Sequence, residues 1–137
     1  MKKLLKIYLS FIFLISICFT GCGLTKIDNE KLSALSYEII EYHYLDSTLR
    51  SIYDSYYKES NRITYNDGDY TYLFVFYGEM PTSGYSIKVK EIYDTPSNIV
   101  VDTTLVGPQK EETIAEKESF PAIVIKIKSL NKTIIFK

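Results

Sequence analysis

The sequence predicts a mainly β protein, an antiparallel β-sandwich or a partly open barrel with one amphipathic helix. From residue 62 onward, apolar and polar residues alternate with a period of two, which is typical of half-buried strands. Clusters of turn-forming residues separate these runs, and one clear helical pattern occurs, over residues 48–60. Regular strands with a single helix favour a sandwich or a barrel over an α/β sheet.

The first 21 residues have the pattern of a secretory signal peptide. Three lysines precede an apolar run over residues 9–19, which is shorter than the about 20 residues of a membrane-spanning helix. The run ends at Phe19-Thr20-Gly21-Cys22, which resembles a bacterial lipobox, although Phe19 stands where an aliphatic residue is usual. This resemblance implies cleavage before Cys22 and diacylation of that residue, for example with palmitate. Two acyl chains, at about 0.8 kcal/mol per buried methylene, would anchor the protein on the outer face of the bacterial cell membrane.

An ordinary secretory cysteine is the alternative interpretation of Cys22. It could pair with Cys18, since disulfides form outside the cytoplasm. Cys18 lies within the apolar run and would leave with the cleaved peptide. The mature chain would then keep one cysteine and form no internal disulfide.

Length and charge predict one domain without affinity for nucleic acid. Removing residues 1–21 from the 137 leaves 116, enough for a single core. We expect a lipidated N-terminus and tether over residues 22–34 and a β-rich domain over residues 35–137. The formal charge is −1, and loss of the three signal lysines makes it −4. Without a basic patch, the chain lacks the electrostatic requirement for binding nucleic acid.

Residues 35–45 are predicted as the first strand, because β-forming residues alternate partly with Glu38 and Glu41. A helix is the alternative, since Leu32, Leu35 and Ile39 also have helical spacing.

The helical pattern follows at once. Asp46 or Ser47 is the predicted cap of the helix over residues 48–60. A tyrosine stripe on a helix is more typical of packing than of a binding surface. The predicted apolar face consists of Leu49, Ile52, Tyr53 and Tyr56.

Residues 62–78 read as two strands joined by a hairpin turn at Asn66-Asp67-Gly68-Asp69. A calcium loop is the alternative for these residues, but the later oxygen ligands and the final Glu of an EF-hand are missing. The remaining predicted strands cover residues 85–94, 98–106, 120–128 and 132–137.

The stretch GEMPTSGYSIKV, residues 78–89, holds a candidate binding loop. Pro81 fixes its own backbone angle, Gly84 can take a positive φ, and Thr82 and Ser83 can hydrogen-bond nearby backbone groups. These are the ingredients of an ordered turn, which needs no function of its own.

The same stretch resembles the G-E-K-P-T-G-G-Y-S-I signature that opens the carboxy-terminal domain of protease complex subunit PrcB-like proteins. The order of the following parts is similar too, with a strand pair ending in proline (NIVVDTTLVGP), a charged connection (QKEETIAEKES) and a last strand that begins at proline (FPAIVIKI). The resemblance covers about residues 70–128. It implies a non-catalytic, exported and often lipid-anchored component that associates with or stabilises a surface protease. Ser83 replaces the first glycine of the family's pair and would resist a positive φ.

Chagasin-type cysteine-protease inhibitors supply a second resemblance. They present a Pro-Thr-Thr-Gly-Tyr loop from an antiparallel β-sandwich, and Pro81, Thr82, Gly84 and Tyr85 match it. Those inhibitors use two further loops, one of them with Arg-Pro-Trp, and this chain has no tryptophan. A protease inhibitor is therefore the alternative function, and pairing through a sheet edge is an alternative route of contact.

The sequence presents no constellation of residues typical of an enzyme. His43 is the single histidine, lies on a predicted strand and has no cysteine nearby, and neither a His/Cys cluster nor a Gly-x-Ser-x-Gly motif occurs. We expect no catalytic residue, metal, cofactor or small-molecule substrate. The hypothesis is a lipid-anchored extracytoplasmic module that binds another protein. Its predicted contact residues are Pro81, Thr82, Ser83, Gly84 and Tyr85.

Overall fold

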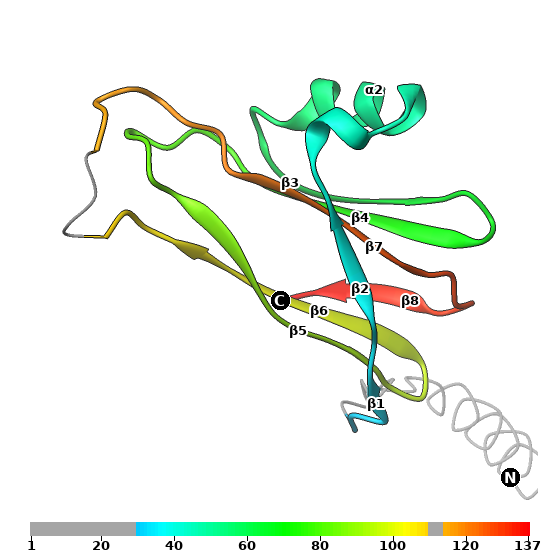
Figure 1. Ribbon diagram of the computed structural model, residues 1–137. Coiled ribbons are helices and arrows are strands. Elements are labelled where there is room, and N and C mark those ends of the chain that lie inside the picture. Colours follow the sequence, from blue (N-terminus) through cyan, green and yellow to red (C-terminus); the bar gives the residue numbers. More distant parts are fainter. Residues whose placement is uncertain (1–29, 110–113) are drawn as a thin grey trace, which may run out of the picture.

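The computed structural model describes residues 30–109 and 114–137, which form two packed β-sheets with one α-helix on the outer face of one of them (Figure 1). We call them the β5 sheet, with strand order β1-β5-β6-β8, and the β4 sheet, with order β2-β7-β4-β3. The predicted β-sandwich is confirmed, and the sheets do not close into a barrel. The strands are β1 (Ser33–Ala34), β2 (Tyr37–Ile40), β3 (Ser60–Asn66), β4 (Tyr70–Tyr77), β5 (Ser86–Asp94), β6 (Asn98–Val106), β7 (Ala122–Lys128) and β8 (Thr133–Phe136).

The predicted signal peptide, Cys22 and residues 22–29 of the predicted tether lie outside the described residues. Residues 32–34, at the end of that tether, already pair with β5. The amide of Leu32 donates to the Asp94 carbonyl at 2.8 Å, and Ser33 stands opposite Asp94.

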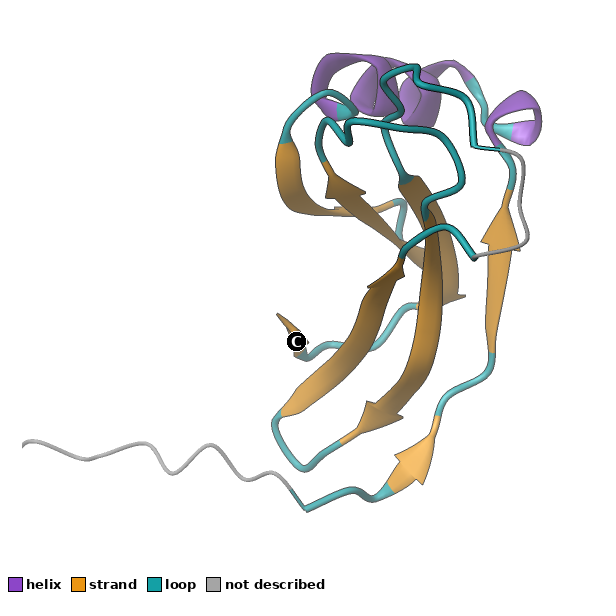
Figure 2. Ribbon diagram, turned by 90° about the vertical axis from the view of Figure 1, so that its left-hand side faces the viewer, coloured by secondary structure: helices purple, strands orange, loops and turns teal. Residues whose placement is uncertain are grey.

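The chain changes sheets between β1 and β2, which closes one side of the sandwich (Figure 2). The predicted first strand is right for Tyr37–Ile40 and wrong beyond it. Tyr42–Tyr44 form a 3-10 turn, η2, which brings the following Leu45 into the core. His43 therefore lies on an exposed turn and not on a strand.

One strand pair departs from the antiparallel prediction. β8 runs parallel to β6, with Asn98 opposite Thr133 and Val101 opposite Phe136. The short connection at residues 129–132 carries the chain from β7, in the β4 sheet, across to the β5 sheet. The direction of β8 is therefore set by a crossing between sheets and not by a hairpin, the connection that makes neighbours antiparallel.

Helix α2 (Ser47–Tyr56) begins at the predicted cap Asp46, whose Oδ1 accepts a hydrogen bond from the Leu49 amide at 2.9 Å. The predicted apolar face is right except at Tyr56, which is 40% exposed. Tyr57 packs in its place. Leu49, Tyr53 and Tyr57 are spaced four residues apart and therefore lie on the same face of the helix.

Strand β4 divides the core into two layers. Its Leu73 and Val75 lie between the two sheets, whereas Phe74 and Phe76 lie under α2. The strand is thus buried on both faces, which explains the nearly continuous apolar run YTYLFVFY. The layer between the sheets is completed by Ile92, Ile99, Val101, Ile123, Ile125 and Ile127, and the layer under the helix by Leu45, Leu49, Tyr72 and Val124.

The predicted hairpin turn joins β3 to β4. Gly68 has φ +105°, and its amide donates to Asn66 Oδ1 at 2.7 Å. Asp67 Oδ1 accepts from the amides of Asp69 and Tyr70 at 3.0 and 2.8 Å. Asn66 Oδ1 and Asp67 Oδ1 are thus occupied by the backbone of the turn itself.

Within the described ranges, no helix is long and apolar enough to span a membrane.

Candidate protein-binding loop

The candidate loop connects β4 to β5 at one end of the sandwich. A second segment, which leads into β7, lies beside it, and both project beyond the sheets (Figure 1). We call Met80–Tyr85 and Ala115–Phe120 the paired loops.

Hydrogen bonds hold the paired loops together. Met80 and Ser119 form an antiparallel bridge, with N···O distances of 2.8 and 3.0 Å. The Ser119 hydroxyl donates to the Thr82 carbonyl at 2.6 Å. Ser83 makes two bonds with Ala115: its amide donates to the Ala115 carbonyl at 3.1 Å, and its Oγ accepts from the Ala115 amide at 2.9 Å. The loop is therefore braced along its length rather than free.

Ser83 fits this arrangement without backbone strain. All residues with positive φ in the described part of the chain are glycines, and in this loop the positive φ belongs to Gly84, at +87°. The expected conflict at Ser83 therefore does not arise. Its hydroxyl instead supplies an acceptor that a glycine would lack.

The loop presents a small surface to solvent. Pro81 and Gly84 are exposed, while Thr82, Ser83 and Tyr85 are half-buried. The Tyr85 ring lies beside Gly107, after the end of β6, where a methyl group on Gly107 would meet Tyr85 Cε1 at 3.8 Å. Pro81, Gly84 and the outer part of the Tyr85 ring are thus the parts of the loop that a partner could reach.

Residues 71–128 match the family model described as PrcB C-terminal. This segment belongs to the PrcB C-terminal family. No curated protein and no solved structure matches the chain. The family match confirms the resemblance seen in the sequence and fits a PrcB-like module associated with a protease complex.

The PrcB C-terminal segment includes most of β4, all of β5, β6 and β7, and both paired loops. Helix α2 and strand β3 precede it, and β8 follows it. The sequence identified Met80–Tyr85, the first of the paired loops, as a candidate site. It did not reveal that the second, Ala115–Phe120, holds the first in place by hydrogen bonds. The polar stretch EKES predicts a solvated connection, and the contacts use backbone groups and hydroxyls, so no side-chain pattern marks them.

The inhibitor alternative meets a physical difficulty at this loop. The Thr82 carbonyl and the Ser83 amide already bond to the neighbouring segment. A loop that enters a protease cleft needs its outer backbone groups for the protease, or it leaves polar groups unpaired in the complex. The PrcB C-terminal loop instead offers an outer corner at Pro81 and Gly84.

The alternative route of contact, pairing through a sheet edge, would use the edge strands on the open side of the sandwich. The edge strands β3 and β8 flank a groove of about 570 Å³. Its two cations are already engaged: the Arg62 guanidinium lies 4.4 Å over the Tyr77 ring, and Lys132 Nζ donates to the Asp94 carboxylate at 2.6 Å. The charged side chains of this groove are thus partnered within the molecule, whereas the loop presents an exposed corner at Pro81 and Gly84, and we favour the loop.

The residues weighed for catalysis or metal binding lie at the surface. His43 Nδ1 is 3.5 Å from Glu41 Oε2, and Glu38 pairs with Lys126 at 3.8 Å. Within residues 30–109 and 114–137, no group of three His, Cys, Asp or Glu side chains could hold a metal ion.

Proposed function

We propose that the protein is a non-catalytic, lipid-anchored, extracytoplasmic module that binds another protein through the corner at Pro81, Gly84 and Tyr85. In this proposal it acts as a PrcB-like subunit that associates with or stabilises a surface protease. The observation that carries the proposal is the PrcB C-terminal match, which contains both paired loops. The anchor at Cys22 is supported by the signal-peptide pattern and the lipobox-like FTGC.

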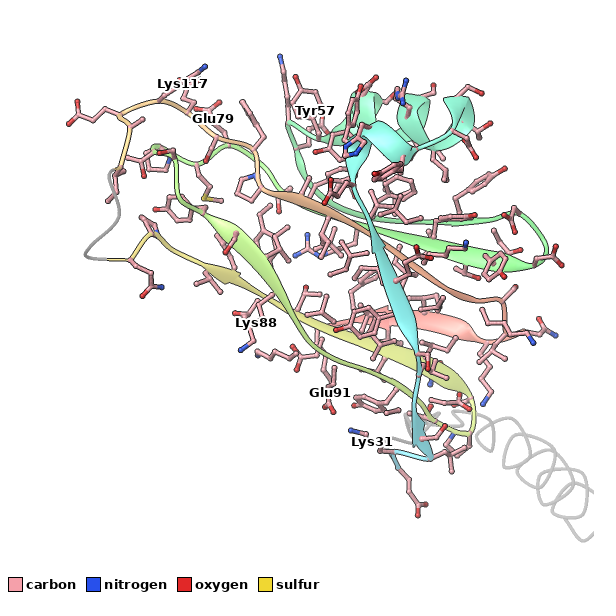
Figure 3. All side chains as sticks on the ribbon, in the orientation of Figure 1. Lys31, Tyr57, Glu79, Lys88, Glu91 and Lys117 are labelled. Carbon is pink, nitrogen blue, oxygen red and sulfur yellow. The ribbon has the colours of Figure 1, made fainter. Side chains whose placement is uncertain are left out.

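The direction of β5 supports a membrane-distal contact. Its last residue, Asp94, pairs with Ser33 in β1, at the end of the predicted tether, while its first residue, Ser86, follows the candidate loop. The nine residues of β5 are joined by eight steps of about 3.3 Å, which separate the two ends by roughly 26 Å. Figure 3 shows Lys31 and Glu91 toward one end and Glu79 and Lys117 at the other. A chain anchored through Cys22 would therefore carry the loop on the side away from the lipid.

A braced loop suits recognition of a protein. Because the hydrogen bonds to Ser119 and Ala115 order the loop in advance, binding loses less conformational entropy than with a free loop. Tyrosine is among the residues that most often dominate protein interfaces. We therefore expect Tyr85 to contribute most of the binding energy from this loop.

The test is a pull-down from detergent-solubilised membranes with the tagged full-length lipoprotein. We expect the wild type to recover a surface protease and Tyr85→Ala to recover at least about tenfold less, as for the loss of a hot spot. Tyr70→Ala is the matched control, because Tyr70 is 41% exposed and starts β4 at the end opposite the loop. Circular dichroism checks that each variant is folded.

Equal recovery by wild type and Tyr85→Ala would remove the loop from the interface, and recovery of no protease by either would overturn the partner class. An assay with a purified papain-type protease tests the inhibitor alternative directly. The anchor has its own test: Cys22→Ala should shift the protein from the membrane fraction to the medium and abolish the acyl mass on the N-terminal peptide.

A further inference from the structure

Four aromatic rings and one carboxylate surround a shallow pocket beside the paired loops. Tyr42, Tyr53, Asp54, Tyr57 and Phe120 line it, and its volume is about 440 Å³. The tyrosines and Asp54 come from η2, α2 and the helix cap, and Phe120 ends the second paired loop. We call this site the aromatic pocket. Figure 3 shows Tyr57 toward the same end of the molecule as Glu79 and Lys117.

The rings support one another in a fixed arrangement. Tyr42 meets Tyr53 edge-on at a centroid distance of 5.0 Å, Tyr53 stacks on Tyr57 at 5.9 Å, and Tyr57 meets Phe120 edge-on at 5.5 Å. Tyr53 also packs edge-on against the fully buried Phe76 at 5.4 Å. The wall of the pocket is thus held from below by the core and needs no ordering on binding.

Asp54 gives the aromatic pocket a negative charge. The Tyr42 hydroxyl donates to both oxygens of Asp54, at 3.0 and 3.2 Å. This hydrogen bond and the charge of Asp54 raise the pKa of Tyr42 above its usual value. No ion pair between described residues includes Asp54. Two cations of the chain lie near the outer rings: the Arg50 guanidinium is 5.4 Å over Tyr42, and Lys58 Nζ is 5.7 Å over Tyr57. Neither pairs with Asp54, and Arg50 donates to the carbonyls of His43 and Leu45.

We propose that the aromatic pocket binds the cationic side chain of an arginine or lysine on a partner protein. The negative faces of aromatic rings attract cations, and aromatic cages bind quaternary ammonium groups in this way. A carboxylate beside the rings adds a charged acceptor for the N–H groups of the ligand. Since Phe120 belongs to the paired loops, a partner seated on the loop lies within reach of the pocket. In this respect the inference rests on the proposed function.

The competing explanation is that these rings only cover the core. In that case the pocket would show no preference for charge, and neutralising Asp54 would change nothing but the Tyr42 hydrogen bond. The two explanations therefore differ in the response to a ligand of fixed shape and variable charge.

The test titrates the purified full-length protein, labelled on its tyrosine rings and held in a maltoside detergent, with N-acetyl-arginine amide. NMR should show saturable shifts at Tyr42, Tyr53 and Tyr57. N-acetyl-citrulline amide, which has nearly the same shape and no charge, should bind at least about fivefold more weakly. Asp54→Asn should weaken arginine binding by about threefold to fivefold. Asp69→Asn, the same change on the distant hairpin turn, should leave it unaltered.

Equal binding of the two amides, unchanged affinity in a folded Asp54→Asn variant, or no saturable shift at these rings would each overturn the inference. The titration contains no partner protein, so its failure is separate from a failure of the pull-down. A positive titration with a negative pull-down would keep the cation site and remove the proposed partner class.

Discussion

The two core layers on either side of β4 differ in chemistry. The buried residues between the sheets are all leucine, isoleucine or valine, and aromatic rings, Tyr77 and Phe136, pack only at the border of this layer. The layer under α2 is largely aromatic, and its outer members, among them Tyr53 and Tyr57, are only half-buried. The same strand supplies both layers, because its successive side chains point to opposite faces.

If the aromatic pocket binds a partner as proposed, this difference separates stability from recognition. Branched aliphatic side chains fill a closed space well and have no polar atom to satisfy. Tyrosine can bury its ring and keep its hydroxyl at the surface, so an aromatic layer can continue into a binding pocket. In this molecule the aliphatic layer holds the sheets together, and the aromatic layer opens into the pocket beside the paired loops.

The largest expected effect is on the free energy of unfolding, when one isoleucine in each core layer is replaced by alanine. Ile125 is fully buried between the sheets, and Ile125→Ala should lower the free energy of unfolding by about 3 kcal/mol. Ile52 is half-buried under α2, and Ile52→Ala should cost about 1 kcal/mol, because less surface is buried and alanine favours the helix. Urea denaturation followed by circular dichroism measures both. Equal losses would contradict the proposed division between the layers.

Much of this fold could be predicted from local patterns. Period-two alternation located the strands from residue 62 onward, and Asp46 marked the start of the helix. The signature around Pro81 identified the family. Each of these signals depends on residues that are close in sequence, where turn chemistry and side-chain periodicity act directly.

The remaining features depend on contacts between distant segments. Tyr42–Tyr44 contain β-forming residues, yet they turn so that Leu45 can enter the core under α2. The parallel pairing of β8 results from a crossing between sheets. The aromatic pocket combines Tyr42, which precedes the helix, with Phe120, which follows a charged connection. No sequence window contains both residues. The predicted packing role of the stripe is confirmed at Tyr53, which packs against the core under α2.

A pH experiment sharpens the comparison at Tyr72, which belongs to the aromatic layer. The pKa of Tyr72 is raised to about 12. Burial is the larger cause, and the hydrogen bond from the Tyr72 hydroxyl to Asp67 Oδ2, at 3.1 Å, is the second. Since the unfolded chain loses this proton first, the stabilisation is complete below pH 10 and is lost as the pH rises toward 12. Urea denaturation at pH 8 and pH 11 should therefore show a smaller alkaline loss for Tyr72→Phe than for the wild type.

At pH 8, Tyr72→Phe should itself cost about 1 kcal/mol, because Asp67 loses one hydrogen bond. Tyr70→Phe controls for removing a tyrosine hydroxyl on the same strand. If Tyr72→Phe and the wild type lose stability in parallel above pH 10, the hydroxyl does not retain its proton in the folded state, and the aromatic layer is more open to water than proposed.

The smallest expected effect lies in the paired loops, which belong to neither core layer. Ser83→Ala removes the acceptor of the Ala115 amide and leaves the backbone bond in place. Because the site is at the surface, the free energy of unfolding should change by less than about 0.5 kcal/mol. The Ala115 amide should nevertheless exchange with water about twofold to threefold faster, as measured by NMR, since exchange needs only a local opening. Ser86→Ala, an exposed serine next to the loop, should leave this rate unchanged. An unaltered rate in Ser83→Ala would mean that the backbone bridge alone braces the loop, and that serine in place of the family's glycine adds nothing to its order.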